Sequence, residues 1–352
     1  MRSRKILFVL SWAFIFVGSI RLTNGAIGEL AEVCNATCMK IREIVAESPF
    51  VVAVYAEKGV DPKQKSRKFN SIGSGIVKKL EGGAMGILTN NHVVSEPIAS
   101  RIWVSFYQKG FLQEVAIIGR DPAADLALLS SPELPQGIVP ATFAKRLELG
   151  QQVYALGYPF GVRRPTFGYV NTLESVSWLY AWTQAPVNPG NSGGPVFNEK
   201  HEVVGINTAI IQGATTTFVL PVEHVNRILP RLSREGIVRH AGAGFVFNDA
   251  SHIPPFFFEE LGLKYPPAQD SVMVYEVEPN SQAARAGIRK GDSILKFNGM
   301  AVKSAKDLDM KMFFDHHPDE AAVFTTKRGT QAFERELALV EYISVFKDQE
   351  TR

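Results

Sequence analysis

Three residues that lie far apart in the chain are of the types that together perform nucleophilic catalysis. His92 follows an apolar run in GILTNNHVVS, Asp125 precedes one in GRDPAADLALLS, and Ser192 stands within NPGNSGGP. A hydroxyl is a poor nucleophile near neutral pH unless an imidazole takes its proton and a carboxylate orients that imidazole. Taken together, a histidine, an aspartate and a serine at strand ends therefore indicate acyl-transfer chemistry.

The glycines around Ser192 add a second requirement of this chemistry. In PGNS, the backbone amides of Gly190 and Ser192 can converge on one point without side chains in the way. One such oxyanion donor stabilises a transition state by about 3–4 kcal/mol. Each residue also has a simpler interpretation: a glycine-rich turn, a structural histidine or a strand-edge carboxylate.

Short apolar runs bounded by Gly, Pro, Asn and Asp supply the elements that must position these residues. From PFVVAVYAE onward they recur at the spacing expected of a β-sandwich or barrel. The segment 222–236 has helical spacing and ends on glycine, as a closing helix would. A second unit begins near Arg239 and spans about 100 residues, the size of one small α+β domain.

The motifs TNNHVV, DLALL and GNSGGPV, followed by a PDZ-like segment, resemble the HtrA (Deg) family of serine proteases over about residues 40–345. The resemblance implies a mostly β fold, with a chymotrypsin-like double β-barrel protease domain followed by an α+β PDZ domain. It also implies that His92 is the general base, Asp125 its orienting partner and Ser192 the nucleophile. Gly190 and Ser192 would supply the oxyanion-hole amides.

The same resemblance predicts a specificity pocket. In trypsin-like enzymes a carboxylate six residues before the serine selects basic side chains, and here that position is the uncharged Pro186. The strand VVGINTAI resembles the family's pocket wall, which would be lined by Ile206, Asn207 and Thr208. We therefore expect a preference for small or medium aliphatic residues before the cut, although these could also be ordinary strand residues.

The PDZ-like segment predicts a site for extended peptides. Its carboxylate-binding loop would be Ala241, Gly242, Ala243 and Gly244, leading into the strand FVF. The other wall of the groove would be the helix around AKDLDMKMF, with Leu308 and Met312 facing in. PDZ domains take a peptide as an added strand, and successive amides can hold a terminal carboxylate. The family often has bulky apolar residues where Ala241 and Ala243 stand.

Two segments depart from the family pattern. Relatives carry QTDA before the active-site loop, where this chain has WTQA at 182–185. The family's sensor loop is represented only by the short SVSWLYAW at 175–182. A short basic loop after the first strand and a single PDZ domain favour a homotrimer over a larger cage.

The N-terminus predicts export. A basic start, a 15-residue apolar core at 6–20 and small residues near Ala26 are typical of a signal peptide, with a short anchor as the alternative. The expected domains are 1–25 signal, 26–48 helical segment, 49–237 protease and 238–346 PDZ. Cys34 and Cys38 are either a disulfide or two buried apolar residues on one helix face.

Composition restricts the functions that fit. The formal net charge is only +3, so nothing indicates nucleic-acid binding, and no metal or cofactor is implied. The prediction is an exported serine endopeptidase, in the periplasm or another extracytoplasmic compartment. It would cleave misfolded or signalling envelope proteins and bind their unfolded or C-terminal segments. The alternatives are a proteolytically silent peptide-binding or chaperone scaffold, and a membrane-anchored regulatory protease with one dedicated substrate.

Overall fold

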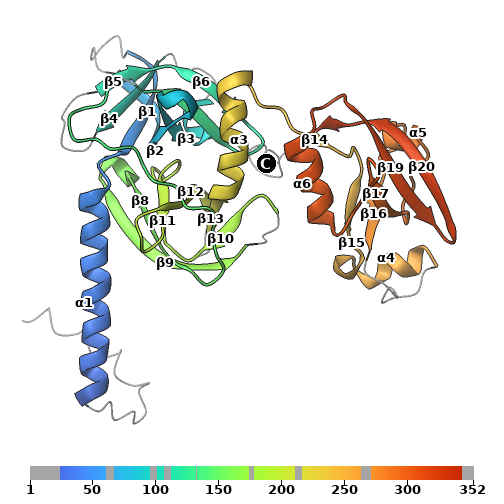
Figure 1. The fold of residues 1–352 in the computed structure, drawn as a ribbon, viewed down its shortest axis with the longest axis horizontal. Coiled ribbons are helices and arrows are strands. Elements are labelled where there is room, and N and C mark those ends of the chain that lie inside the picture. The colour runs from blue at the N-terminus through green and yellow to red at the C-terminus, as the bar shows by residue number, and fades with distance from the viewer. Residues whose placement is uncertain are drawn as a thin grey trace, which may run out of the picture. The chain divides into compact units, whose positions relative to one another are not determined.

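The structure is a computed structural model in which eight segments are described (Figure 1). They are residues 24–60, 67–95, 101–106, 112–131, 133–173, 178–210, 216–262 and 271–342. The predicted signal segment therefore lies almost wholly outside the described residues. No helix among the described residues is long and apolar enough to cross a membrane.

The first compact unit ends at Glu47 and is described through one helix, α1 (Asn24–Glu47). This helix begins two residues before the helical segment that the sequence predicts at 26–48 and ends one residue before that segment ends. Cys38 lies on it with an exposed, free thiol. Neither alternative for the cysteine pair therefore describes Cys38, because its sulfur is not in a disulfide and is not buried.

The first sheet of the second unit carries His92 and Asp125 near its strand ends. Its strands pair in the order β5-β4-β1-β2-β3-β7-β6. The two outer strands, β5 and β6, are separated in sequence only by Ala116, whose carbonyl accepts the amide hydrogen of Ser130 at 2.7 Å. The sheet therefore curls back on itself as a barrel does. The bounds are β1 (Val51–Val60), β2 (Arg67–Lys79), β3 (Met85–Thr89), β4 (Arg101–Phe106), β5 (Leu112–Val115), β6 (Ile117–Asp121) and β7 (Leu126–Ser130), with η1 (Glu81–Gly83) and α2 (Asn91–Ser95).

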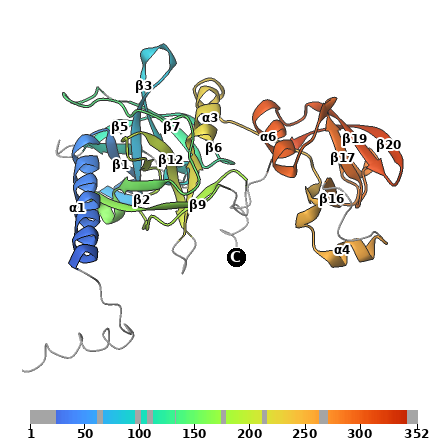
Figure 2. The same cartoon turned by 60° about the horizontal axis from the view of Figure 1, so that its bottom comes forward.

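The second sheet carries the Ser192 loop and is a closed barrel in the order β10-β13-β12-β11-β8-β9, whose strands are labelled in Figure 1. Figure 2 shows strands β9 and β12 of this sheet from a second direction. Its interior is filled by small and branched apolar side chains such as Val153, Ala155 and Val196. The bounds are β8 (Gln152–Gly157), η2 (Pro159–Gly161), β9 (Arg164–Thr172), β10 (Ala181–Thr183), β11 (Pro195–Phe197), β12 (Val203–Ile210) and β13 (Thr217–Pro221).

Helix α3 (Val222–Glu235) follows the second barrel and confirms the predicted closing helix. Its buried residues Val222, Val225, Ile228 and Leu232 recur at helical spacing. They face β6, where a side chain at Gly119 would lie 2.0 Å from the carbonyl oxygen of Leu232. Only glycine allows this close approach between helix and strand.

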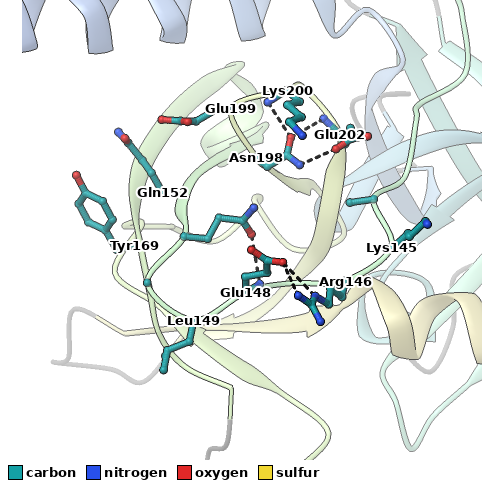
Figure 3. Close-up of a pocket in the computed structure, with 13 residues that line it drawn as sticks. Lys145, Arg146, Glu148, Leu149, Gln152, Tyr169, Asn198, Glu199, Lys200 and Glu202 are labelled. Atoms are coloured by element: carbon teal, nitrogen blue, oxygen red, sulfur yellow. Dashed lines mark hydrogen bonds and ion pairs between the residues drawn. The ribbon is translucent and has the colours of Figure 1, made fainter.

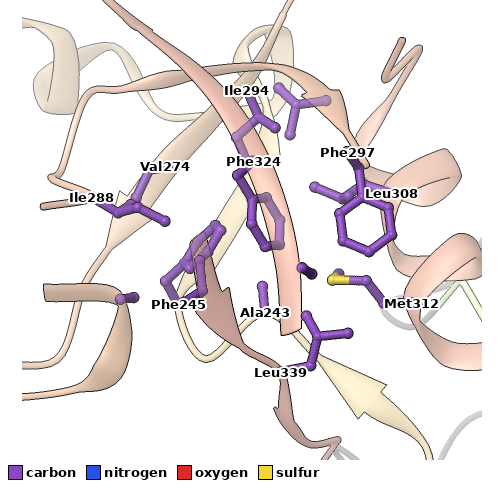
Figure 4. Close-up of a cluster of buried hydrophobic side chains, with 14 of the residues drawn as sticks. Ala243, Phe245, Val274, Ile288, Ile294, Phe297, Leu308, Met312, Phe324 and Leu339 are labelled. Atoms are coloured by element: carbon purple, nitrogen blue, oxygen red, sulfur yellow. The ribbon is translucent and has the colours of Figure 1, made fainter. Parts of the chain in front are cut away.

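The C-terminal segment forms one sheet in the order β15-β16-β17-β19-β20, with a two-stranded β14-β21 pair beside it. Its core joins Phe245, Phe297 and Phe324 to Leu308 and Met312 of the long helix (Figure 4). The fold class predicted from the sequence is confirmed. The bounds are β14 (Ala241–Gly242), β15 (Val246–Asp249), η3 (Ala250–His252), α4 (Pro255–Glu260), β16 (Val272–Glu276), α5 (Gln282–Arg285), β17 (Ser293–Phe297), β18 (Met300–Ala301), α6 (Ala305–Asp315), β19 (Ala321–Arg328), β20 (Gln331–Ala338) and β21 (Val340–Glu341).

Candidate active site

His92 and Asp125 are brought together by strand pairing. Thr89 at the end of β3 pairs with Ala127 near the start of β7, so the segments that carry the two residues emerge side by side. Asp125 closes the turn between β6 and β7 with φ +50°, a left-handed conformation that aspartate tolerates better than most residues. The side chain of Asn90 secures this turn by donating to the Asp125 carbonyl at 2.7 Å.

The Asp125 carboxylate holds His92 through both of its oxygens. One accepts the backbone amide hydrogen of His92 at 2.8 Å, and the other lies 2.7 Å from Nδ1 of its ring. Because an ionised carboxylate can only accept, Nδ1 carries the ring proton, and Nε2 is left as the basic nitrogen. His92 is 41% exposed, so an incoming substrate can reach the ring.

Ser74 of β2 connects the Ser192 loop to the first barrel. Its amide donates to the carbonyl of Ser192 at 2.7 Å, and its hydroxyl donates to the carbonyl of Gly190 at 2.7 Å. The same hydroxyl accepts the amide hydrogen of Tyr158 at 2.9 Å. One buried serine therefore fixes two carbonyls of the loop and the end of β8, which belongs to the other barrel.

The backbone of the loop lies against the segment that carries His92. A side chain at Gly193 would lie 2.2 Å from the Ser74 carbonyl oxygen and 3.0 Å from the Asn90 amide nitrogen. A side chain at Gly73 would be 2.6 Å from Val93, next to His92, and 3.1 Å from the carbonyl oxygen of Ser192. The His92 and Ser192 segments thus both pack against β2 at residues 73 and 74.

Between Gly190 and Gly194, two amides have no acceptor within the described residues, and they are the two predicted from the sequence. Asn191 donates to Asn188, Gly193 to Asn207 and Gly194 to Asn191, each at 2.9–3.0 Å. No acceptor among the described residues receives the amide hydrogens of Gly190 and Ser192. Since Gly190 is buried, its free amide is suited to an oxygen supplied by a ligand.

The predicted pocket wall lies on β12, directly beside the loop. Ile206, Asn207 and Thr208 are all buried, and the Thr208 carbonyl accepts weakly from the Ser192 hydroxyl at 3.4 Å. Asn207 exchanges backbone hydrogen bonds with Gly193 and Gly194, and its side-chain amide donates to the carbonyls of Gly194 and Pro195. Asn207 therefore anchors the chain after Ser192, and its place in a substrate pocket stays a prediction.

The predicted carboxylate loop lies between a short strand and a sheet edge. Ala241 and Gly242 pair with β21, while β15 is the outermost strand of its sheet. No acceptor among the described residues receives the amide hydrogens of Ala243 and Gly244. The side chains of Ala243, Leu308 and Met312 are at most 4% exposed and belong to the core (Figure 4). The loop therefore offers backbone amides, whereas these three side chains offer little surface.

A hollow of about 950 Å³ on the second barrel contains none of the predicted site residues (Figure 3). It is lined by residues 144–146, 148–152, 198–200, Tyr169 and Glu202. Many of its polar groups bind one another: Asn198 bonds to Lys200 and Glu202, and Arg146 bonds to Glu148. Those groups are satisfied within the chain, so the hollow is a weaker candidate than the Ser192 loop.

Sequence reasoning missed Ser74 and Asn90. Ser74 had a usable signal, because the run IGSGIV places a serine between two glycines in a strand, which indicates close backbone approach. Asn90 stands in the TNNH motif but has no chemical signal of its own. Both act by holding backbone atoms of the predicted residues.

Two family comparisons match separate parts of the chain. Residues 73–206 match the trypsin-like peptidase domain, and residues 259–339 match the PDZ domain. A probable periplasmic serine endoprotease DegP-like of Pseudomonas putida is 33% identical over 254 residues, which are 69% of this chain and 51% of that protein. The serine protease Do-like HtrB of Bacillus subtilis is 31% identical over 260 residues, 69% of this chain and 56% of that protein. The chain thus spans about half the length of these relatives.

Solved structures of proteases also resemble this chain. The HtrA-type protease AlgW with a decapeptide superposes with a TM-score of 0.68 at 25% identity, over 85% of this chain and 98% of that one. The serine endoprotease from Yersinia pestis superposes with a TM-score of 0.63 at 24% identity, over 86% and 98% of the two chains. The described strands therefore follow an arrangement already seen in an HtrA-type protease.

Proposed function

The chain belongs to the HtrA-type serine proteases with one PDZ domain, and we propose that it is an exported serine endopeptidase acting on misfolded or signalling envelope proteins. The observation that carries this proposal is the pairing of His92 with Asp125 beside a loop whose Gly190 and Ser192 amides have no acceptor among the described residues. A scaffold without activity would not need a basic Nε2 and two unused donors in one place.

The mechanism follows from these groups. Ser192 Oγ attacks the scissile carbonyl carbon while His92 Nε2 removes the hydroxyl proton, and Asp125 stabilises the resulting imidazolium. The oxygen of the tetrahedral intermediate accepts from the Gly190 and Ser192 amides, which contribute about 3–4 kcal/mol each. His92 then delivers its proton to the leaving amine. Water, deprotonated by the same nitrogen, hydrolyses the acyl-enzyme and restores Ser192.

Substrate capture is proposed at two places. Ile206, Asn207 and Thr208 would accept a small or medium aliphatic side chain before the cut, in agreement with the uncharged Pro186. The amides of Ala243 and Gly244 would hold a terminal carboxylate, while the peptide adds to the free edge of β15. A library of peptides that was cleaved mainly after Lys or Arg would contradict the first assignment.

The assembly is proposed to be a homotrimer. Phe160 is 71% exposed in a left-handed backbone conformation with φ +54°, and Val162 close by is 60% exposed. A bulky residue held in this conformation on the surface is a sign of a contact outside the chain. Size-exclusion chromatography with light scattering tests this proposal. The wild type should have three times the mass of one chain, and the Phe160→Ser variant should have a smaller mass.

The proposed activity predicts that Ser192→Ala abolishes casein digestion. The loss is roughly 10⁴- to 10⁶-fold in kcat, because no other hydroxyl stands at this position. Labelling by a fluorophosphonate probe should disappear with it, since the probe reacts only with an activated serine. Hydrophobic C-terminal peptides should raise the wild-type rate.

Ser233→Ala is the matched control, since it removes the same hydroxyl from an exposed position on α3. It should leave both readouts at the wild-type level. Absence of cleavage and labelling in the wild type, with and without peptide, would favour the silent scaffold instead.

A further inference from the structure

A buried histidine links three elements close to the active site. His240 lies between α3 and β14, and its side chain and that of Asp121 are fully buried. Nε2 of its ring is 2.6 Å from a carboxylate oxygen of Asp121, at the end of β6. Nδ1 is 2.6 Å from the carbonyl oxygen of Phe313 in α6, and the imidazole stacks on the Phe313 ring at 3.5 Å with 8° between the planes.

These contacts fix the role of each ring nitrogen of His240. A carbonyl oxygen can only accept, so Nδ1 must donate its proton to the Phe313 carbonyl. Nε2 and the Asp121 carboxyl group then share one short hydrogen bond. The Phe313 carbonyl lies in the last turn of α6, where the helix dipole favours a cation.

Other charged groups face this pair. Nη1 of the largely buried Arg231 lies 3.4 Å from His240 Nδ1, and its Nη2 lies 3.2 Å from His317 Nδ1. Arg231 is neutralised by Glu235 through two hydrogen bonds of 2.8 and 3.0 Å. Because Glu235 pairs with Arg231, the Asp121 carboxyl group remains the partner of His240.

The second oxygen of Asp121 connects this pair to the catalytic turn. It accepts the amide hydrogens of Ala123 at 3.1 Å and Ala124 at 2.9 Å, and so fixes the start of the turn that ends at Asp125. Asp121 pairs with Leu126 in the β6–β7 ladder, so the turn consists of the four residues between them. A shift of the Asp121 carboxylate would therefore move the turn that positions Asp125.

We propose that Asp121 and His240 are positioning residues for catalysis, which set the β6–β7 turn and tie its geometry to α6 of the PDZ domain. This inference rests on the proposed protease function and adds residues outside the predicted triad. Helix α6 is the predicted wall of the peptide groove, so a shift of Phe313 would reach Asp125 through two side chains. Trp178 makes a second contact with the same helix, at 5.1 Å from the Phe313 ring.

The kinetic test uses the full chain and counts active sites with a fluorophosphonate probe. We expect Asp121→Asn and His240→Gln to lower kcat per titrated site about 10- to 100-fold at unchanged KM, because His92 is held less well. The dependence of kcat on pH should also change in both variants, because His92 is held differently. Asp121→Glu, which keeps the charge, should recover part of the rate. A merely structural role would lower the number of titrated sites without lowering the rate at each site.

His252→Gln is the matched control, since this histidine is exposed on η3. Wild-type kcat per site and an unchanged pH profile in both variants would overturn the proposal. Nitrogen NMR of the histidine rings in the Ser192→Ala full chain needs no change at Asp121 or His240. A proton on Nδ1 of the His240 ring is expected, because this atom faces the Phe313 carbonyl, and an Nδ1 without a proton would also overturn the proposal. A wild type without Ser192-dependent cleavage would instead refute the proposed protease function, whatever the NMR result.

Discussion

The loop around Ser192 and the loop at residues 241–244 are both rich in glycine and both leave amides without acceptors among the described residues, but they are held differently. In the first, a side chain on Gly190 or Gly193 would lie 2.5 or 2.2 Å from a backbone oxygen. In the second, a side chain on Gly242 would meet nothing closer than 3.6 Å. Chemistry on a developing charge requires donors fixed in advance, whereas a peptide-binding loop can adapt to its ligand.

Gly193→Ala should have the largest effect on stability and activity, and it tests whether the Ser192 loop is the more rigid of the two loops. The new methyl group would lie against the backbone of Ser74, and φ at this position is +82°, which is unfavourable for alanine. We expect a loss of about 3 kcal/mol or more in the free energy of unfolding, together with loss of activity. Thermal melting and fluorophosphonate labelling measure the two effects. A variant with wild-type melting and labelling would show that the loop is not rigid.

Acid should destabilise the protein where α3 contacts α6, the helix that forms the predicted wall of the peptide groove. Burial lowers the pKa of His224 to about 4, and its ring contacts Phe314 of α6 at 5.3 Å. Below pH 6.5 the unfolded chain takes up a proton that the folded chain refuses, so stability is lost as the pH falls towards 4. The loss is about 3 kcal/mol.

Urea unfolding at pH 7 and pH 4.5 measures this term in wild type and His224→Gln. The variant cannot titrate at this position, so the difference between its two unfolding free energies should be smaller by about 2–3 kcal/mol. His252→Gln, at an exposed position, should retain the full wild-type difference. An equal pH dependence in wild type and His224→Gln would contradict the assignment.

Ser74→Ala tests what keeps the Ser192 loop rigid. The change removes the hydrogen bond to the Gly190 carbonyl and leaves the buried Tyr158 amide without its acceptor. We expect a loss of about 1–3 kcal/mol in stability, and a kcat about tenfold lower because the Gly190 amide is less well aimed. Ser233→Ala controls for the loss of a hydroxyl. A lower melting temperature with full kcat per titrated site would limit Ser74 to a structural role.

What the sequence could predict was local. The closing helix at 222–236 and the turn between β6 and β7 follow from spacing and from residues next to one another in the chain. The bond from Ser74 to Gly190 spans 116 residues and that from His240 to Asp121 spans 119. No periodicity reports such contacts, because they arise only when two barrels and a linker have packed. The roles assigned to His92, Asp125 and Ser192 came from resemblance, while the closeness of His92 and Asp125 follows from strand pairing.

Gly242→Ala gives the smallest effect and the one of opposite sign. This glycine does not have a positive φ, and the nearest atom to an added methyl group is the Tyr342 Cα at 3.6 Å, an ordinary contact. Alanine at a compatible position restricts the unfolded chain, so the free energy of unfolding should rise by about 0.4–1 kcal/mol. Casein digestion should stay at the wild-type rate, and peptide stimulation should be retained. If Gly242→Ala were as damaging as Gly193→Ala, the two loops would be equally constrained, and adaptability of the PDZ loop could no longer explain its small side chains.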